Sequence, residues 1–547
     1  MRAVIGRRLD RLSDECKRAL TSASVLGREF DVEALARAAQ QELDPLLDLL
    51  DEAIAAGVVG EVPGTHGRLR FVHVLIRDTL YDELTPTRRM RLHRRIGEAF
   101  EALYAGDPEP HLAELTLHFY EALPAGDAVK TVHYARRAAG RAAALLAYEE
   151  AARLYAVALE VIESHSPSDR SERCEVLLAL GDVQARSGLS ARAKETFLRA
   201  AEAARAAALP EHLARAALGY GGRFVWTRAW GDEHLVPLLE EALGALPLED
   251  SELRVRLLAR LAGGPLRDTL PPEPREVMSQ EALEMARRLG DGLTLAYALD
   301  GRHCANMGPE SLALRRALAD ELVAVADRVG DKERAYEGHD YRFHALLEAG
   351  ELRAARTEYQ ALWRRARELR QPAQLWFASV NGAKLALFEG RFADAEQAIE
   401  EAVEVGREAQ GANAQMAFDL QVYALRREQG RLDEVLDVVE RAVDEYPAYP
   451  VWRYVLADTL AQLGRDDEAR RLFASLAGDG FPLYLEMQWL FGLSLAADVC
   501  GYLAEAQAAA TLYERLSPYA GHNATLPPEL CWGSVSRALG TLAATMS

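Results

Sequence analysis

A short pattern recurring along the second half of the chain constrains its fold more than any other feature of the sequence. A glycine is followed five positions later by a small or branched residue and, in most copies, nine positions later by a large apolar one, as in "AGELRAARTEY" and "EGRFADAEQAI". Such a fixed period is typical of stacked repeats, here at intervals of about 34 to 40 residues. The glycines are Gly350, Gly390, Gly430, Gly464 and Gly501, with an earlier copy at Gly188.

Further helix breakers lie between these glycines, at Gly290, Gly330, Gln371-Pro372 and Gly411. The segments between breakers are about 20 residues long and carry apolar residues at helical spacing. Glycine past a helix end adopts the left-handed conformation that ends a helix, so the pattern predicts antiparallel helical hairpins. The small residue allows two helices to cross closely. One hairpin cannot bury its apolar stripe alone, so the hairpins are expected to stack into a solenoid.

The first 104 residues follow a different pattern. Three helical segments, ending in "LDPLLDLLDEAIAAG", precede "VVGEV" and "RLRFVHV", which flank a turn rich in proline and glycine. This order predicts a winged helix with a β-hairpin at about residues 58–73, the only appreciable β-structure expected in the chain. The third helix carries Asp44, Asp48, Asp51 and Glu52 without Lys or Arg, so it favours contact with protein over docking in DNA.

Two resemblances follow from these residues. Gly181, Gly188, Ala193, Phe197 and Ala200 match the tetratricopeptide repeat. The stretch "FVHVLIRDTLYDELTPTRRMRLHRRIGEAFEALY" resembles the winged-helix module that follows the nucleotide-binding domain in signal-transduction ATPases with numerous domains. The likeness is greatest to large LuxR-type regulators and ATPase-coupled nucleotide cyclases.

The second resemblance implies a P-loop ATPase partner, in cis or in trans, and ATP or ADP in full-length members. It also implies a nucleotide-sensing role for His73, which stands where related ATPases have a histidine that contacts the ADP β-phosphate. No G-x-x-x-x-G-K-[ST] motif exists in this sequence, so no cofactor is expected in this chain. The chain is expected to be the regulatory middle part of such a protein, as a fragment or as a shortened gene product.

The predicted fold class is all-α: a right-handed tetratricopeptide-like α-solenoid preceded by a small winged-helix domain. Residues 1–104 are assigned to the winged helix and its connecting helix, 105–275 to irregular helical repeats, and 276–547 to the tetratricopeptide-like array. By the repeat register, inner-helix positions line a concave groove of mixed charge, suited to a polar ligand or a peptide. These groove-binding candidates are Arg302, Asp340, His344 and Lys384.

Other candidate sites are weaker. Trp226 and Trp230 lie four residues apart, a spacing that favours core packing over a ligand pocket. His111 and His118 lack a carboxylate or cysteine at ligand spacing, so a packed or capping role is favoured over a metal site. No catalytic motif and no metal site is predicted.

Composition excludes several classes of protein. The net charge is −20, which disfavours a general nucleic-acid surface. The five cysteines are dispersed without C-x-x-C spacing, as expected in a reducing compartment. No apolar run reaches the length of about 20 residues that spans a bilayer, and no signal peptide opens the chain, so a cytoplasmic location is predicted.

The predicted function is therefore a non-catalytic sensor scaffold that binds a protein partner or small inducer and relays that event to the ATPase. The setting would be transcriptional or cyclic-nucleotide signalling, and oligomerisation is left open. Two alternatives are a regulator that binds DNA directly, and a hydrolase or transferase with its site in the solenoid groove.

The missing P-loop leads to a first prediction. Binding a triphosphate requires a nest of backbone N–H groups at a helix N-terminus, usually with a lysine and a held Mg²⁺. We expect residues 1–547 to show no tight ATP binding by calorimetry and no ATPase activity. Micromolar binding of ATP by this chain would contradict the scaffold interpretation.

A second prediction concerns His73 in a full-length protein that includes the ATPase domain. There, His73→Ala should weaken the retention of ADP, and an unchanged ADP affinity would show that His73 has no nucleotide-sensing role.

Overall fold

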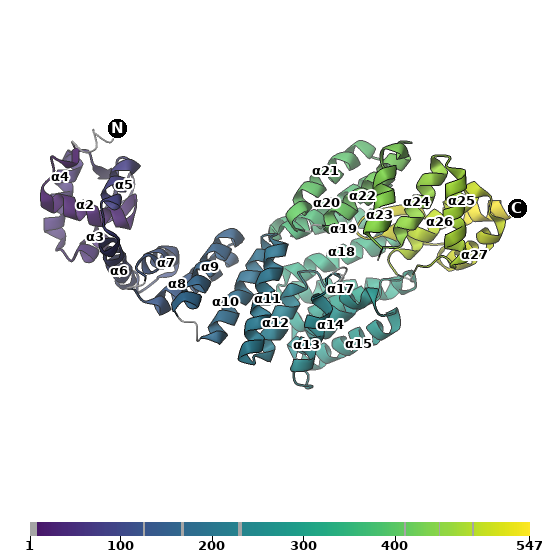
Figure 1. The fold of residues 1–547 in the computed structure, drawn as a ribbon, viewed down its shortest axis with the longest axis horizontal. Coiled ribbons are helices and arrows are strands. Elements are labelled where there is room, and N and C mark those ends of the chain that lie inside the picture. The colour runs from purple at the N-terminus through teal and green to yellow at the C-terminus, as the bar shows by residue number, and fades with distance from the viewer. Residues whose placement is uncertain are drawn as a thin grey trace. The chain divides into compact units, whose positions relative to one another are not determined.

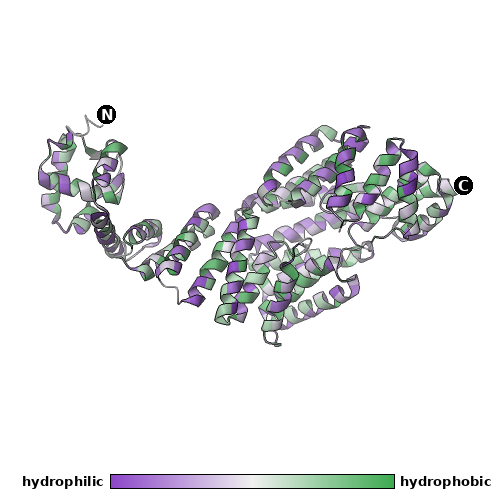
Figure 2. Ribbon diagram, in the orientation of Figure 1, coloured by the Kyte–Doolittle hydropathy of each residue, from purple (hydrophilic) through white to green (hydrophobic). Residues whose placement is uncertain are grey.

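The computed structural model of the protein describes residues 8–123, 126–165, 169–227, 232–409, 412–447, 449–483 and 486–547. The chain separates into two compact units, Met1–Val183 and Gln184–Ser547. Both are built mainly from helices, which Figure 1 labels in chain order. Figure 2 shows hydrophilic and hydrophobic residues side by side along most helices, as amphipathic helices require. Among the described residues, no helix is both long and apolar enough to cross a bilayer.

The first unit begins with helices and a small antiparallel sheet of order β1-β3-β2. Phe30 of β1 pairs with Leu69 of β3, and Val59 of β2 pairs with Phe71 of β3. The elements are α2 (Asp14–Leu26), β1 (Glu29–Asp31), α3 (Val32–Ala39), α4 (Leu43–Ala55), β2 (Val59–Glu61), β3 (Arg68–Phe71), α5 (Val74–Asp82), α6 (Pro86–Leu103), η1 (Glu109–His111), α7 (Leu112–Glu121), α8 (Ala128–Ala144), α9 (Tyr148–His165) and α10 (Arg170–Arg186).

The hairpin predicted near residues 58–73 is confirmed as β2 and β3, and the three preceding helical segments are confirmed as α2, α3 and α4. Strand β1 adds a third strand that the sequence did not suggest. Leu20, Leu46 and Phe71 are buried together in the core between these helices and the sheet. The order of elements is that of the expected winged helix, although membership of that class stays a prediction.

The second unit is a train of antiparallel helices with a terminal β-hairpin. Its elements are α11 (Ser190–Ala207), α12 (Pro210–Tyr220), α13 (Leu235–Ala245), α14 (Glu252–Gly263), η2 (Pro265–Asp268), α15 (Pro272–Leu289), α16 (Gly292–Ala305), η3 (Pro309–Ser311), α17 (Leu312–Val329), α18 (Lys332–Glu348), α19 (Leu352–Leu369), α20 (Pro372–Phe388), α21 (Phe392–Ala409), α22 (Ala412–Glu428), η4 (Leu432–Glu434), α23 (Leu436–Glu445), α24 (Val451–Gln462), α25 (Asp466–Gly478), α26 (Trp489–Leu503), α27 (Ala506–Leu516), η5 (Ser517–Tyr519), β4 (Asn523–Leu526), β5 (Leu530–Ser534) and α28 (Val535–Met546). Successive helices pack against one another, so the predicted helical-repeat solenoid is confirmed.

The predicted repeat register holds at most of the turns. Gly350, Gly390, Gly430 and Gly464 each follow a helix with φ between 69° and 77°, the left-handed region that glycine enters without steric cost. Five positions later the small or branched residue is buried at each copy, fully so in the case of Ala355, Ala395 and Ala469. Gly411 lies outside the described residues.

The last copy of the repeat was assigned wrongly. Gly501 lies inside α26 rather than at its end, and the left-handed residue is Ala504, with φ 57°. The buried small residue is accordingly Ala509, five positions after Ala504. The turn therefore lies three residues later than predicted, because alanine occupies the position where the other copies have glycine.

A second correction concerns β-structure. The hairpin at residues 58–73 was expected to be the only appreciable one, but β4 and β5 form another near the C-terminus. The strands flank a short turn at Pro527-Pro528, and Leu526 pairs with Leu530. This hairpin packs against the inner helices α18, α20, α22 and α26. It therefore covers a helix face that was predicted to be an open groove.

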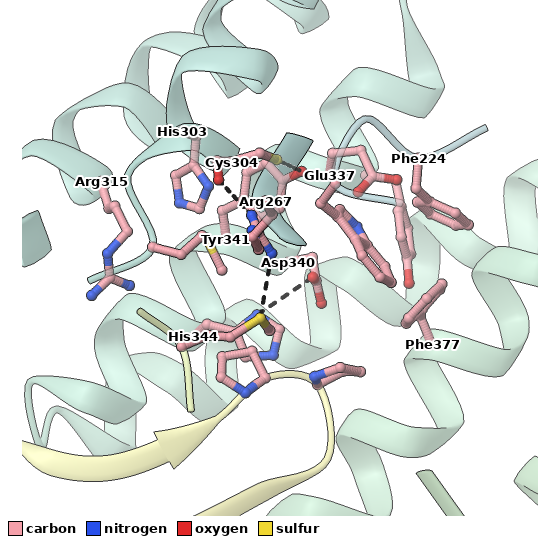
Figure 3. Close-up of a pocket in the computed structure, with 16 residues that line it drawn as sticks. Phe224, Arg267, His303, Cys304, Arg315, Glu337, Asp340, Tyr341, His344 and Phe377 are labelled. Atoms are coloured by element: carbon pink, nitrogen blue, oxygen red, sulfur yellow. Dashed lines mark hydrogen bonds and ion pairs between the residues drawn. The ribbon is translucent and has the colours of Figure 1, made fainter. Parts of the chain in front are cut away.

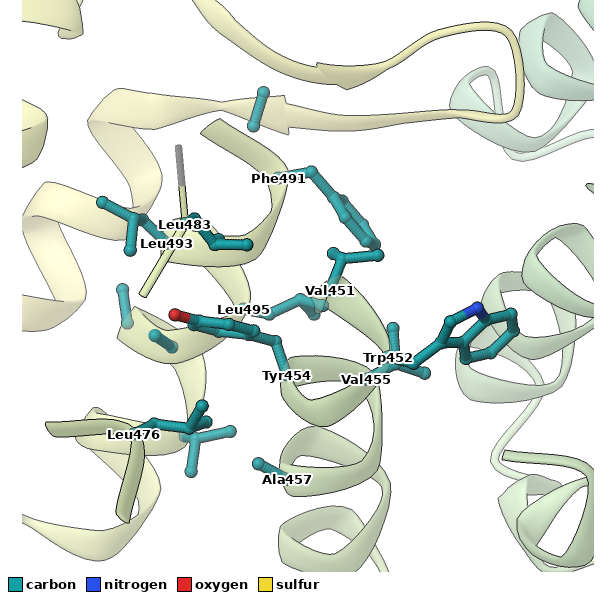
Figure 4. Packing of buried hydrophobic residues seen from close by; sticks show 14 of the residues in the cluster. Val451, Trp452, Tyr454, Val455, Ala457, Leu476, Leu483, Phe491, Leu493 and Leu495 are labelled. Carbon is teal, nitrogen blue, oxygen red and sulfur yellow. The ribbon is translucent and has the colours of Figure 1, made fainter. Parts of the chain in front are cut away.

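Near the C-terminal end of the array the core is continuous from one hairpin to the next. Figure 4 shows Tyr454 of α24 among aliphatic side chains of neighbouring helices, including Leu476 of α25 and Leu493 of α26, while Trp452 points to the opposite side of α24. Trp452 is fully buried. Each repeat thus shares its apolar surface with the next one, as a solenoid requires.

The register yields a prediction about Ala395. Its side chain is fully buried at the start of α21, where α20 and α21 pack together, whereas Ala393 is exposed on the same helix. Ala395→Trp should lower the free energy of unfolding by about 1–3 kcal/mol or more, because the crossing has no room for an indole. Ala393→Trp is the matched control and should change stability by less than about 0.5 kcal/mol. Equal melting temperatures for the two variants would refute the register.

Candidate functional site

The inner helices α16, α18 and α20 bury an unusual number of charged side chains. Each of the three helices is packed against neighbouring helices, and the β4–β5 hairpin also packs against α18 and α20. Residues that would normally face water are therefore enclosed. The buried charged residues and histidines of these helices are Asp300, Arg302, His303, Arg334, Glu337, Asp340, His344, Glu348 and Lys384.

A small cavity of about 30 Å³ lies among these residues. Figure 3 shows the side chains that line it, with Arg315 and His303 at one end and Phe224 and Phe377 at the other. Glu337 and Asp340 of α18 lie between the two ends. Pro527 and Pro528, at the tip of the β4–β5 hairpin, form part of the wall. The hairpin thus covers one side of this cavity.

The aromatic end consists of three rings in mutual contact. The centroids of Phe224 and Phe377 are 4.6 Å apart, and those of Trp226 and Phe377 are 5.1 Å apart, both in edge-to-face geometry. Phe224 and Trp226 lie 5.6 Å apart. Edge-to-face pairs of this kind are favourable in apolar surroundings. Trp226 is therefore a cavity residue as well as a packing residue, while Trp230 lies outside the described residues.

At the opposite end, His303 of α16 is fully buried with neither ring nitrogen hydrogen-bonded. Its ring stacks on Tyr341 with centroids 3.9 Å apart. Burial lowers the pKa of His303 well below its ordinary value, and the positive charges of Arg315, His344 and Arg267 lower it further. The imidazole is thus neutral, with one donor and one acceptor nitrogen left without a partner. Such groups are rare in protein interiors and point to a missing partner.

Glu337 is the second group in the cavity without a partner. Its side chain is buried, and no hydrogen bond joins its carboxyl to any other described residue. Burial raises the pKa of Glu337 to about 8, although the nearby Arg334 guanidinium opposes the shift. Arg334 itself is paired with Asp300 and cannot fully compensate Glu337. At neutral pH this carboxyl is therefore largely protonated.

Asp340 and His344, by contrast, are satisfied. Asn381 donates from Nδ2 to Asp340 Oδ1 at 2.6 Å, and its Oδ1 lies 3.1 Å from His344 Nε2. His344 Nδ1 lies 3.4 Å from Asp340 Oδ2. Burial alone would raise the pKa of Asp340, but His344, Lys384 and the bond from Asn381 lower it below its ordinary value. Asp340 is therefore an ionised carboxylate on the cavity wall.

Lys384 of α20 is completely enclosed and does not line the cavity. Burial lowers its pKa to about 8, while Asp340, Cys531 and Glu529 act in the opposite direction. Its ammonium lies over the Phe343 ring at 4.9 Å. Because Glu529 and Cys531 belong to the hairpin segment, Lys384 interacts electrostatically with that segment rather than with open solvent.

The hairpin is fixed by specific contacts with the inner helices. Gln421 Nε2 donates to the backbone oxygens of both Val380 and Glu529 at 2.9 Å, and Asn523 Nδ2 donates to the Leu347 oxygen at 2.8 Å. Trp532 stacks on Tyr423 with centroids 6.1 Å apart. These contacts, together with the burial of Leu526 and Leu530, make the hairpin part of the folded core.

The predicted groove residues thus have different positions. Asp340 and His344 line the cavity, whereas Arg302 and Lys384 do not. Arg302 donates to Ser279 Oγ at 3.1 Å and pairs with Glu276 at 3.0 Å. The expected groove is therefore reduced to this cavity, with Asp340 and His344 on its wall and with Arg302 and Lys384 buried away from it. Glu337 and His303 were not singled out from the sequence, because the polar stretch "EGHDYRFHA" has the pattern of a solvated helix.

The N-terminal candidates have local roles in the structure. His73 is exposed and precedes α5, where its Nδ1 accepts a bond from Leu75 N at 3.2 Å. His118 is buried with its Nδ1 3.0 Å from His93 Nδ1, and His111 lies 2.9 Å from Glu114. Within the described ranges no three His, Cys, Asp or Glu side chains form a group that could hold a metal ion.

Comparison with known proteins supports the repeat class. Residues 426–481 match the tetratricopeptide repeat family model. Comparison with curated proteins gives no match. One similar solved structure is a signal transduction ATPase with numerous domains and a tetratricopeptide repeat sensor from Pyrococcus horikoshii, at 14% identity and a TM-score of 0.36, covering 88% of this chain.

This chain spans 64% of the length of that ATPase. Another similar structure is a Rap protein complexed with competence and sporulation factor, at 14% identity and a TM-score of 0.20, covering 82% of this chain and 90% of that one. These identities and TM-scores are too low to carry a functional assignment.

The cavity wall depends on a buried ion pair, which yields a prediction. Arg315 of α17 donates to both oxygens of Glu348 at 2.9 and 2.8 Å, and both side chains are buried. Glu348→Ala should lower the free energy of unfolding by about 3–5 kcal/mol, because it leaves the guanidinium buried without its counter-charge.

The matched control is the neighbouring exposed pair of Arg316 and Glu351. Glu351→Ala should change the denaturant midpoint little, because water replaces the lost contact. Similar losses of stability in the two variants would show that the Arg315–Glu348 pair is not enclosed as described.

Proposed function

We propose that this chain is a non-catalytic regulatory sensor whose helical repeats bind a small effector in the cavity between α16, α18, α20 and the β4–β5 hairpin. The observation that carries the proposal is His303, whose two buried ring nitrogens have no hydrogen-bond partner among the described residues, in one cavity with the buried carboxyl of Glu337. Leaving a buried polar group without a partner costs about 1–3 kcal/mol. A ligand that supplies those partners would recover that free energy on binding.

The proposed output is a change in how the repeat unit engages a protein partner. Helical-repeat proteins present extended surfaces to other chains, and the cavity is walled by residues of several repeats and of the hairpin. An effector bound there would contact all of them and could bias their packing. We infer a P-loop ATPase domain, in cis or in trans, as the partner, in keeping with the family resemblance of residues 71–104.

The chain itself is proposed to carry out no chemistry. The cavity holds a neutral histidine, a protonated carboxyl and an ionised aspartate, but the aspartate and His344 are bound to Asn381 and to each other. The proposal also places nucleotide hydrolysis in the partner domain, and places signalling in transcription or in cyclic-nucleotide synthesis.

A thermal-shift experiment tests the effector proposal. The small-molecule fraction of a bacterial extract should raise the melting temperature of the wild-type chain, because a ligand that binds only the folded state stabilises it by mass action, by about 2.7 kcal/mol at one hundred times its dissociation constant. The shift should be absent in Glu337→Leu, which replaces the unpartnered carboxyl with an apolar side chain, and retained in Glu351→Leu. No shift in the wild type, or an equal shift in Glu337→Leu, would contradict the proposal.

A further inference from the structure

Three types of side chain line the cavity, each in its own region. Figure 3 shows His303 and Arg315 at one end, the carboxyl-bearing residues Glu337 and Asp340 in the middle, and the rings of Phe224 and Phe377 at the other end. A ligand complementary to all three regions needs an anionic group, a donor-rich or cationic group and an apolar group, in that order.

The end at His303 favours an anion. The positive charges of Arg315, His344 and Arg267 all act on this ring, while the carboxylates of Glu348 and Glu486 pair with the two guanidinium groups. Arg315 is held by Glu348, and Arg267 Nε lies 3.3 Å from Glu486, so both guanidinium groups are fixed in place. The neutral imidazole can donate its one N–H to a carboxylate oxygen. A carboxylate is the group that gains most from a fixed donor in a positive field.

The middle region favours a cation. Asp340 is ionised, and the Glu337 carboxyl lacks any hydrogen-bond partner among the described residues. An ammonium group beside them would supply hydrogen-bond donors to the Glu337 carboxyl and would add to the favourable charges of Arg334 and Arg223. Burial would then no longer hold Glu337 in its protonated form, because an opposite charge nearby stabilises the carboxylate.

The far end favours an apolar or aromatic group. Phe224, Trp226 and Phe377 present ring faces and edges, and Phe224 and Phe377 are almost completely buried. The Trp226 side chain is only partly buried, so it can report on occupancy by fluorescence. Aromatic surfaces of this kind bind hydrocarbon side chains and rings by excluding water.

We propose that the effector is a free α-amino acid in its zwitterionic form, with an apolar or aromatic side chain. Its carboxylate lies at His303, its ammonium group at Glu337 and Asp340, and its side chain against Phe224, Trp226 and Phe377. This proposal rests on the effector-binding function proposed above and names the chemical class of the effector.

The cavity must widen to accept such a molecule. Its volume of about 30 Å³ is room for no more than a few water molecules. Two flexible side chains, Met307 and Met487, line it and can change rotamer at low cost. Binding is therefore expected to move these methionines and to change the surroundings of Trp226.

Titration calorimetry with four probes tests the proposal on the wild-type chain. L-phenylalanine and L-leucine carry all three groups, 2-phenylethylamine lacks the carboxylate, and 3-phenylpropanoate lacks the ammonium group. At least one of the two amino acids should bind saturably, with a change in tryptophan fluorescence. If L-phenylalanine binds, the dissociation constant of each incomplete analogue should be at least about tenfold higher than that of L-phenylalanine, because each analogue leaves one set of buried groups without a partner.

Two variants assign the ends of the ligand. Glu337→Gln should weaken binding of the amino acid and of 2-phenylethylamine, and leave 3-phenylpropanoate unchanged. His303→Phe keeps the ring stacked on Tyr341 and should weaken binding of the amino acid and of 3-phenylpropanoate only. The exposed Glu351→Gln variant is the control and should bind every probe as the wild type does.

Either incomplete analogue binding as tightly as the amino acid would overturn the zwitterion proposal. So would a failure of both amino acids while the bacterial extract still shifts the melting temperature of the wild type, in which case the effector belongs to another chemical class. If the extract does not raise the melting temperature and no probe binds in calorimetry, both the effector-binding function and this proposal are contradicted.

Discussion

The structure of the second unit depends on one constraint, namely that α16, α18 and α20 are packed on nearly all sides. In an ordinary helical repeat the inner helix has one face in water, where charged residues cost nothing. Here the β4–β5 hairpin and the neighbouring helices cover that face, so charged side chains must find partners inside the protein. The Arg315–Glu348 pair and the Asp340–Asn381–His344 group are the result.

Lys384 Nζ is also buried without a hydrogen-bond partner among the described residues, but it lies off the cavity wall. On the cavity wall itself, two exceptions are informative. Every other charged group on the cavity wall is paired or carries hydrogen bonds within the described part of the chain, but His303 and Glu337 have none. Burial holds both groups in their neutral form, because it lowers the pKa of His303 and raises the pKa of Glu337. Under the proposed function, a cationic group that binds beside Glu337 would displace its proton, so that ligand binding and protonation of the protein would be coupled.

The repeat could be predicted from sequence because its signal is local and periodic. The left-handed turn residue favours glycine, and the crossing of two helices requires a small residue. Gly390 therefore predicts a turn, and Ala395 predicts a close contact between helices. The rule failed at Gly501 because Ala504 takes the left-handed conformation instead, at a cost in strain that the surrounding packing compensates.

The site could be predicted only in part, because its key features are not local. Asp340 and His344 were found from the repeat register, but the register says nothing about what covers the inner face. The covering hairpin comes from residues 523–534, far along the chain, and its strands are too short to show alternation on either side of Pro527-Pro528. If the covering hairpin is not known, the sequence predicts that Glu337 and His303 are ordinary solvent-exposed residues of a helix.

The central claim is that the cavity holds a buried carboxyl, Glu337, that lacks a hydrogen-bond partner among the described residues and can bind an ammonium group. The protonation state of Glu337 tests this claim most directly, because it depends on all three properties. Infrared difference spectroscopy between the wild type and Glu337→Gln can detect the carbonyl band of a protonated carboxyl. The account predicts that this band is present in the ligand-free wild type at pH values below about 8 and is lost when an ammonium-bearing ligand binds. An ionised Glu337 in the ligand-free chain at neutral pH would contradict it.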